Sequence, residues 1–196
     1  EADGTPLGGE QFGYAFDDIG NRTSATNNTK LSTYEANELN QYLLRNVPGV
    51  VDTIGDISSS SNVVVTVNGE AATRQGAHFH HQLTVDNSFA PAYPRIKVIA
   101  GVKDGGPNGT DVVVAVSGNR YVPRARERFT YDEDGNMTRD GRWAMTWDAE
   151  NRLVAMETIP AAVTVGAPRQ RLEFGYDSQS RRVHKKVSLW NTTGEV

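Results

Sequence analysis

Three histidines between positions 78 and 81 are the residues of this sequence best suited to chemistry. On an extended strand, alternate side chains project from the same face, so His78 and His80 would lie one pleat apart. Neutral imidazoles at this spacing can share a divalent metal such as zinc or manganese, and a metal-bound water can attack an ester, phosphoester or lactone. Open candidates for a third ligand are Glu70, Asp86, Asp111 and His184.

A plainer interpretation of this strand needs no metal. One set of alternate residues would face a core, namely Phe79, His81, Leu83 and Val85. The other set would face water, namely His78, His80, Gln82 and Thr84. The sequence has no cysteine, no Gly-x-Ser-x-Gly elbow and no phosphate-binding glycine loop, and we interpret the serine run at 58–61 as a polar loop.

Exposed aromatic rings are a second possible site, because they can stack on the apolar faces of sugars. Trp143 and Trp147 are the candidates for carbohydrate binding, and the alternative is that both rings pack in a core. The basic stretch from Arg124 to Arg128 is interpreted as a solvated strand edge.

A short repeated motif predicts the elements that would position these residues. Each copy has an aromatic residue, an Asp, two variable residues and then Gly, Asn or Ser. The copies begin at Phe16, Tyr131, Trp147 and Tyr176, and a looser copy begins at Tyr34.

Each copy is typical of the tip of a β-hairpin. The Asp can accept hydrogen bonds from the backbone N–H groups that follow it, and Gly or Asn tolerates a positive φ at the end of the turn. These turn residues are Asp17, Gly20, Asp132, Gly135, Asp148, Asn151 and Asp177. The alternative, that the Asp residues are catalytic carboxylates or calcium ligands, requires them to converge on one substrate or ion.

The repeated motifs resemble the YD repeats of the RHS family. The similarity covers roughly residues 10–46 and 125–190, and it is carried by runs such as Tyr131-Asp132-Glu133-Asp134-Gly135-Asn136. The resemblance implies a hollow β-shell around a toxic cargo, in a parent protein that is secreted or displayed at the cell surface. The Asp-Pro-x-Gly self-cleavage signature of such shells is absent, and the histidines at 78 and 80 depart from the family pattern.

The middle of the chain predicts a different module. Alternating apolar residues lead into Asn68-Gly69, the strongest two-residue hairpin signal, and further strands are predicted at 79–85, 96–100 and 112–116. This stretch resembles bacterial immunoglobulin-like inserts. We therefore predict a mainly β chain with three domains: hairpins at 1–46, an inserted β-sandwich at 47–122 and hairpins that form a curved antiparallel sheet at 123–196. One short helix is predicted near residues 35–45.

The composition of the chain limits the kinds of partner that it is expected to bind. The net charge of −4 and the pI of about 5.6 argue against a nucleic-acid partner, and no apolar run is long enough to span a membrane. Because the chain starts at Glu1, we interpret it as a segment of a longer protein, and its unpaired strand edges predict self-association. The predicted function is a structural segment of an RHS shell, with a metal-dependent hydrolase or a carbohydrate-binding module as alternatives.

Overall fold

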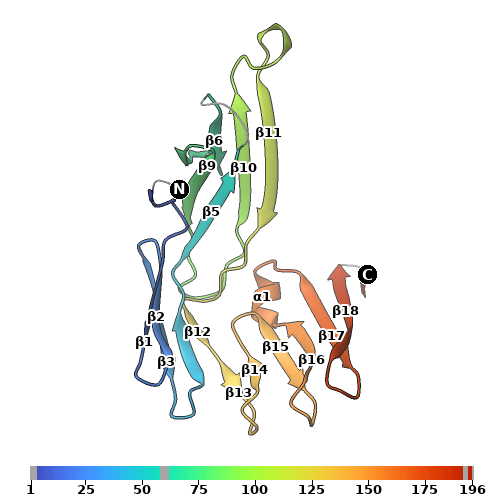
Figure 1. Cartoon of the computed structure of the whole chain (residues 1–196). Coiled ribbons are helices and arrows are strands. Elements are labelled where there is room, and N and C mark those ends of the chain that lie inside the picture. The colour runs from blue at the N-terminus through green and yellow to red at the C-terminus, as the bar shows by residue number, and fades with distance from the viewer. Residues whose placement is uncertain (1–3, 58–61, 192–193, 196) are drawn as a thin grey trace.

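The computed structural model describes residues 4–57, 62–191 and 194–195, so the serine run at 58–61 lies outside the described residues. The described chain is mainly β, and its strands form four antiparallel sheets (Figure 1). The predicted fold class is therefore confirmed. The helices are short: a 3-10 turn at Pro107–Gly109 and α1 at Pro160–Thr164. In the described part of the chain no helix is long and apolar enough to cross a membrane.

The first sheet begins with four consecutive strands and ends with a distant one. In spatial order its strands are β1 (Phe12–Phe16), β2 (Arg22–Asn27), β3 (Lys30–Ala36), β4 (Tyr42–Asn46) and β12 (Arg126–Arg128). Arg126 pairs with Asn46, so the chain rejoins the sheet beside the strand from which it left.

The helix predicted near residues 35–45 is wrong, because this segment is the β3–β4 hairpin, in which Tyr34 pairs with Arg45. The reason is local. The Asn37 side-chain oxygen accepts hydrogen bonds from the N–H groups of Leu39 and Gln41, and Asn40 adopts a φ of 61°. These features make a turn and prevent helical continuation.

Two smaller sheets lie between β4 and β12 in the sequence. One has the order β5 (Val50–Asp56), β9 (His78–Thr84) and β8 (Thr73–Gln75). The other has the order β11 (Val112–Asn119), β10 (Arg95–Val102), β6 (Val64–Val67) and β7 (Glu70–Ala71). The predicted Asn68-Gly69 turn joins β6 to β7, and both residues have positive φ values, 50° and 90°.

A shared core holds these two sheets together. Phe79 from β9 packs with Val63 and Val65, and partly buried residues of β10, Val98 and Ala100, pack against that cluster. The result is a small sandwich, and its strands extend away from the hairpin sheets in Figure 1.

The last sheet consists of seven strands in sequence order. They are β13 (Thr130–Tyr131), β14 (Met137–Arg139), β15 (Trp143–Trp147), β16 (Leu153–Thr158), β17 (Arg169–Tyr176), β18 (Arg182–Asn191) and β19 (Gly194–Glu195). A small core of Ile159, Ala162 and Ala167 lies at α1, and Tyr93 and Tyr121 pack against it. The division into domains at 1–46, 47–122 and 123–196 stays a prediction.

Candidate anion-binding site

The Asp residues of the repeated motif lie in hairpin turns, each closed by its own side chain. Asp17 Oδ1 accepts hydrogen bonds from the N–H groups of Ile19 and Asn21, at 3.1 and 2.7 Å. The same atom of Asp132, Asp148 and Asp177 accepts from the N–H four residues later. The turns end in positive φ values at Gly20, Gly135, Asn151 and Ser180.

These hydrogen bonds favour the ionised form of Asp17, Asp148 and Asp177. The Asn21 amide group lowers the pKa of Asp17 below its ordinary value, and the backbone N–H of Arg152 does the same for the pKa of Asp148. The pKa of Asp177 is lowered first by the backbone N–H of Arg181. Each of these four carboxylates accepts hydrogen bonds within its own turn, so no two of them converge on one substrate.

The histidines of β9 are covered on the side that was predicted to face water. His78 Nε2 lies 3.0 Å from the carbonyl oxygen of Gly8, and His80 Nε2 lies 2.6 Å from Asp52 Oδ1. Gly8 lies directly over the His80 ring, since a Cβ at Gly8 would come within 2.9 Å of His80 Nδ1. The exposed fractions of the His78 and His80 side chains are accordingly only 12% and 20%.

The structure does not gather the suggested third ligands around His78 and His80. Glu70 lies 3.5 Å from His81 instead, and Asp86 accepts hydrogen bonds from Ser88. Within the described residues, no group of three His, Cys, Asp or Glu side chains is arranged to hold a metal. Binding of zinc or manganese at His78 and His80 stays a prediction.

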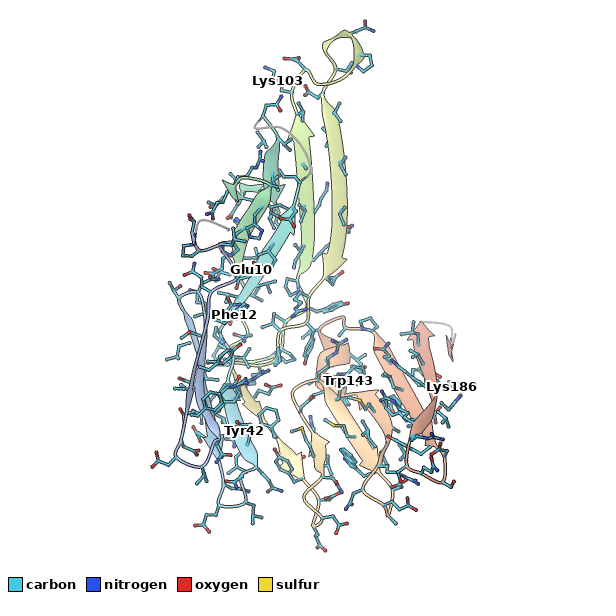
Figure 2. All side chains as sticks on the ribbon, in the orientation of Figure 1. Glu10, Phe12, Tyr42, Lys103, Trp143 and Lys186 are labelled. Atoms are coloured by element: carbon cyan, nitrogen blue, oxygen red, sulfur yellow. The ribbon has the colours of Figure 1, made fainter. Side chains whose placement is uncertain are left out.

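Trp143 and Trp147 lie on one face of β15 and are both half-buried. The Trp147 indole N–H donates to the carbonyl oxygen of Met137 at 2.8 Å, and the Arg142 guanidinium lies 5.0 Å from the centre of the Trp143 ring. Trp143 lies within the last sheet, well away from Phe12 on the first (Figure 2). Both rings therefore take part in packing interactions inside the protein.

A different group of residues forms the best candidate site. Arg124, Arg126 and Arg128 alternate with less exposed residues on β12 and just before it, so their side chains lie on one face of an edge strand. With Arg139 of β14 they line a cavity of about 530 Å³, which we call the arginine pocket. The stretch interpreted from sequence as a solvated edge is thus one wall of a cavity.

The arginine pocket has an excess of unpaired positive charge. Within the described residues none of its four arginines forms an ion pair; Arg124 only donates weakly to the Ser88 carbonyl oxygen, at 3.4 Å. The cavity wall contains two carboxylates, Glu127 and Asp140, and both are engaged elsewhere. Asp140 accepts hydrogen bonds from two backbone N–H groups, at 2.7 and 2.6 Å.

Glu127 belongs to a buried network under the pocket. Its carboxylate accepts from Arg45 at 2.5 and 2.7 Å and from the Gly141 N–H at 3.1 Å. Burial raises the pKa of Glu127, and the Arg45 charge opposes that shift. The Tyr121 hydroxyl donates to the Gly141 carbonyl oxygen at 2.5 Å, and burial raises the pKa of Tyr121 to about 12. This network joins the first and last sheets at the pocket.

The rest of the pocket is apolar. Ile159, Ala161 and Val165 form part of its lining, and the Phe89 side chain at its edge is 87% exposed. Guanidinium groups bind phosphates and carboxylates through paired hydrogen bonds, and an exposed ring can stack on a planar group. The pocket therefore suits an anion that carries a flat or apolar part.

Sequence reasoning identified the basic stretch but missed the site. The available signal was the spacing of Arg124, Arg126 and Arg128, which predicts one strand face. Nothing local indicated that Arg139 and Phe89 would join them. That placement depends on contacts between distant segments.

The fold and the pocket together describe a chain of antiparallel hairpin sheets and a small sandwich, with an arginine-lined pocket. No protein-family model matches the chain. It is 28% identical over 109 residues to the tRNA3(Ser)-specific nuclease WapA of Bacillus spizizenii, and 27% identical over 109 residues to the tRNA nuclease WapA of Bacillus subtilis. Each of these matches covers 56% of this chain and 4% of the relative.

A third similar protein is the tRNA(Glu)-specific nuclease WapA of Bacillus subtilis subsp. natto, which is 34% identical over 62 residues. That match covers 32% of this chain and 2% of the relative. The chain thus spans a small fraction of the length of the proteins that it matches.

These findings correct the identification and the function predicted from sequence. Membership of the RHS/YD-repeat family is not supported, because no family model matches and the relatives are WapA proteins. The predicted functions, a structural shell, a metal-dependent hydrolase and a carbohydrate-binding module, are overturned by relatives that are named tRNA nucleases. The repeated turns that suggested the family explain local folding and carry no functional conclusion.

Proposed function

We propose that this chain is a segment of a large tRNA nuclease similar to WapA, and that its arginine pocket contacts RNA. The observation that carries the proposal is the pocket itself, in which four arginines that form no ion pair within the described part of the chain lie beside an exposed phenylalanine. The names of the relatives make tRNA the RNA to test first. Cleavage of tRNA is proposed for the whole protein, and RNA contact for this segment.

The net charge of −4 had argued against a nucleic-acid partner, but net charge does not describe a local surface. At physiological ionic strength, charges beyond about 8 Å are largely screened, so a bound phosphate responds mainly to its near neighbours. In the pocket those neighbours are four guanidinium groups and two carboxylates, and the Glu127 carboxylate is already paired with Arg45. The local charge therefore favours an anion.

The geometry suits an extended nucleic-acid strand. Alternate residues on a β-strand are about 6.6 Å apart, so Arg126 and Arg128 can contact two successive phosphates. Phe89 offers an exposed ring, on which a base can stack without a sequence requirement. We therefore expect RNA binding that depends strongly on salt and only weakly on sequence.

Fluorescence anisotropy with labelled tRNA tests the contact. Reversing two charges in Arg126→Glu/Arg128→Glu should weaken binding by at least about tenfold and reduce the slope of log K against log salt, since fewer counterions are released. The matched control is Arg95→Glu/Arg182→Glu, which makes the same charge change at two exposed arginines outside the pocket and should keep most of the affinity. Equal affinity losses in both variants would refute a specific role for the pocket.

The whole-protein proposal has a separate test. The full-length protein that contains this chain should cleave tRNA in a time course followed on denaturing gels. Intact tRNA after incubation with the folded full-length protein would overturn the nuclease proposal. Binding of tRNA by the isolated chain would still be informative about the pocket.

Two further proposals concern the location of the parent protein and the self-association of the chain. The parent protein is proposed to be secreted or displayed at the cell surface, which fractionation of the producing cells would test. The chain is also proposed to self-associate through unpaired strand edges, because such edges can pair with a second copy.

A further inference from the structure

A second cavity lies against one face of β1 and its neighbouring strands. Its volume is about 400 Å³, and we call it the β1 cavity. Phe12 and Tyr14 of β1 line it, and they pair with Asn27 and Ala25 of β2, which also line it. Lys30 of β3 pairs with Asn27 and extends the same face. Paired residues on adjacent strands share a face of the sheet, so three consecutive strands contribute side chains to this cavity.

The β1 cavity is separate from the arginine pocket. Arg45 of β4 lines the β1 cavity and pairs with Glu127 of β12, so both side chains project from the cavity face of the sheet. Because side chains alternate along a strand, Arg126 and Arg128 project from the opposite face. None of the described residues lines both cavities. A ligand in the β1 cavity therefore uses none of the arginines that are proposed to contact RNA.

Three cations of the β1 cavity are available to a ligand. Arg22, Lys30 and Arg120 all line it, and none of them forms an ion pair within the described part of the chain. Arg45 also lines it, but the Arg45 guanidinium is paired with Glu127. Guanidinium and ammonium groups only donate hydrogen bonds, so the natural complement of the three available cations is an anion.

The balance of charge in the β1 cavity favours a dianion. Among the described residues its lining includes one carboxylate, Asp52 of β5, whose Oδ1 lies 2.6 Å from His80 Nε2. With His80 neutral, the three available cations exceed this carboxylate by two charges. A phosphate monoester carries about 1.5 to 2 negative charges at pH 7, whereas an internal phosphodiester or a carboxylate carries a single charge. A terminal phosphate therefore matches the cavity best.

Aromatic rings beside these cations suit a nucleic-acid base. Phe12 and Tyr14 line the cavity and are 59% and 56% exposed, so their rings are accessible to a planar group. The Arg22 guanidinium lies 4.9 Å from the centre of the Tyr14 ring and 5.6 Å from the centre of the Tyr34 ring. Its Nε atom is buried and has no hydrogen-bond partner in the part of the chain that the structure describes. A guanidinium held between two rings in this way loses little freedom when it binds a phosphate.

We propose that the β1 cavity binds a nucleoside monophosphate. The phosphate lies among Arg22, Lys30 and Arg120, and the base stacks on Phe12 or Tyr14. A free nucleotide and the phosphorylated end of an RNA strand share this chemistry. The inference goes beyond the proposed RNA contact and does not rest on it, because other residues form the arginine pocket.

Isothermal titration calorimetry of the full 196-residue chain tests the proposal with 5′-AMP and 3′-AMP. At least one of them should bind saturably, and adenosine and inorganic phosphate, which each lack half of the ligand, should bind at least about tenfold more weakly. A chain that binds neither nucleotide, or that binds inorganic phosphate as tightly as the nucleotide, would overturn the proposal.

Charge reversal assigns the binding to the cavity. Lys30→Glu/Arg120→Glu should weaken nucleotide binding by at least about tenfold. The matched control Arg95→Glu/Lys103→Glu makes the same charge change at two exposed residues outside the cavity and should keep the affinity. Lys103 lies at the far end of the sandwich from Phe12 (Figure 2). Equal losses in both variants would refute the assignment.

Two further variants separate the base from the phosphate and the cavity from the arginine pocket. Phe12→Ala/Tyr14→Ala should weaken nucleotide binding by at least about fivefold and leave phosphate binding unchanged, since only stacking is removed. Arg126→Glu/Arg128→Glu should bind the nucleotide as the wild-type chain does. Nucleotide binding that is lost in this variant and kept in Lys30→Glu/Arg120→Glu would place the nucleotide in the arginine pocket and overturn the proposal.

Short oligoadenylates distinguish the two sources of the ligand. They are titrated into Arg126→Glu/Arg128→Glu, so that the arginine pocket does not contribute to binding. An oligoadenylate that binds only with a terminal phosphate, as tightly as the nucleotide, assigns the cavity to an RNA end. Nucleotide binding without binding of the phosphorylated oligoadenylate assigns it to a free nucleotide.

Discussion

Glu127 provides the sharpest test of how this protein is held together. Its side chain is 5% exposed and connects Arg45 of β4, in the first sheet, to the Gly141 backbone ahead of β15, in the last sheet. These contacts close a loop of more than eighty residues in the sequence. Replacing Glu127 with Ala removes three hydrogen bonds at once and leaves the Gly141 N–H without its acceptor.

The stability loss expected for Glu127→Ala follows from the burial of Glu127 and Arg45. Removing one member of a fully buried ion pair costs about 3–5 kcal/mol, because the other charge is left buried and unpaired. The Arg45 side chain is 34% exposed and can regain some water, so we expect the lower end, about 3 kcal/mol. For a chain of this size that loss corresponds to a decrease in Tm of roughly 6–12 °C.

The pH dependence of the unfolding free energy distinguishes the effect of the Glu127 charge from the effect of its packing. Burial raises the pKa of Glu127 in the folded state, so the folded protein binds this proton more tightly than the unfolded chain does. This difference in pKa contributes a free energy that stabilises the folded protein. The contribution is fully present below the pKa of Glu127 in the unfolded chain, and it is lost as the pH rises through the pKa of Glu127 in the folded protein. Glu127→Gln keeps an oxygen that can accept from the Gly141 N–H but cannot ionise, so its stability should lack this loss.

Urea unfolding followed by tryptophan fluorescence, from about pH 4 to pH 8, measures both effects. The wild-type chain should lose stability relative to Glu127→Gln as pH rises, and Glu127→Ala should be the least stable of the three. An Ala variant within about 0.5 kcal/mol of wild type would refute the argument, since that is the range of ordinary surface substitutions. Equal pH profiles for wild type and Glu127→Gln would refute the assigned role of ionisation.

Two further predictions concern positions with well-defined surroundings. A Cβ at Gly49 would come within 2.2 Å of the Val85 carbonyl oxygen, whereas a Cβ at Gly118 would meet nothing within 4 Å. Gly49→Ala should therefore lower Tm markedly in a thermal melt, and Gly118→Ala should not. Equal melting temperatures for the two variants would contradict the packing described at Gly49. The zinc or manganese site predicted at His78 and His80 is tested by elemental analysis after incubation with either metal and dialysis. Stoichiometric metal that is lost in His78→Ala/His80→Ala would confirm the site, and no metal in either protein would refute it.

Much of the local structure could be predicted from the sequence alone, because turns and strand faces depend on residues only a few positions apart. The Asn68-Gly69 turn lies where it was predicted, and Phe79 is buried as strand alternation indicated. The one clear local error was the helix at 35–45. There the looser copy of the motif, which begins at Tyr34, forms a hairpin turn that Asn37 stabilises, and a helix cannot continue through this turn.

The candidate site could not be predicted, because it is assembled from segments that are distant in the sequence. Arg126 and Arg128 become a cavity wall only after β12 pairs with β4 and Arg139 comes alongside. The covering of the β9 histidines by Gly8 is likewise a long-range contact. The sequence by itself determined a mainly β chain with hairpin turns at specific residues. Which strands meet, and therefore which charges lie together, was decided only by the tertiary structure, since those pairings depend on the packing of the whole chain.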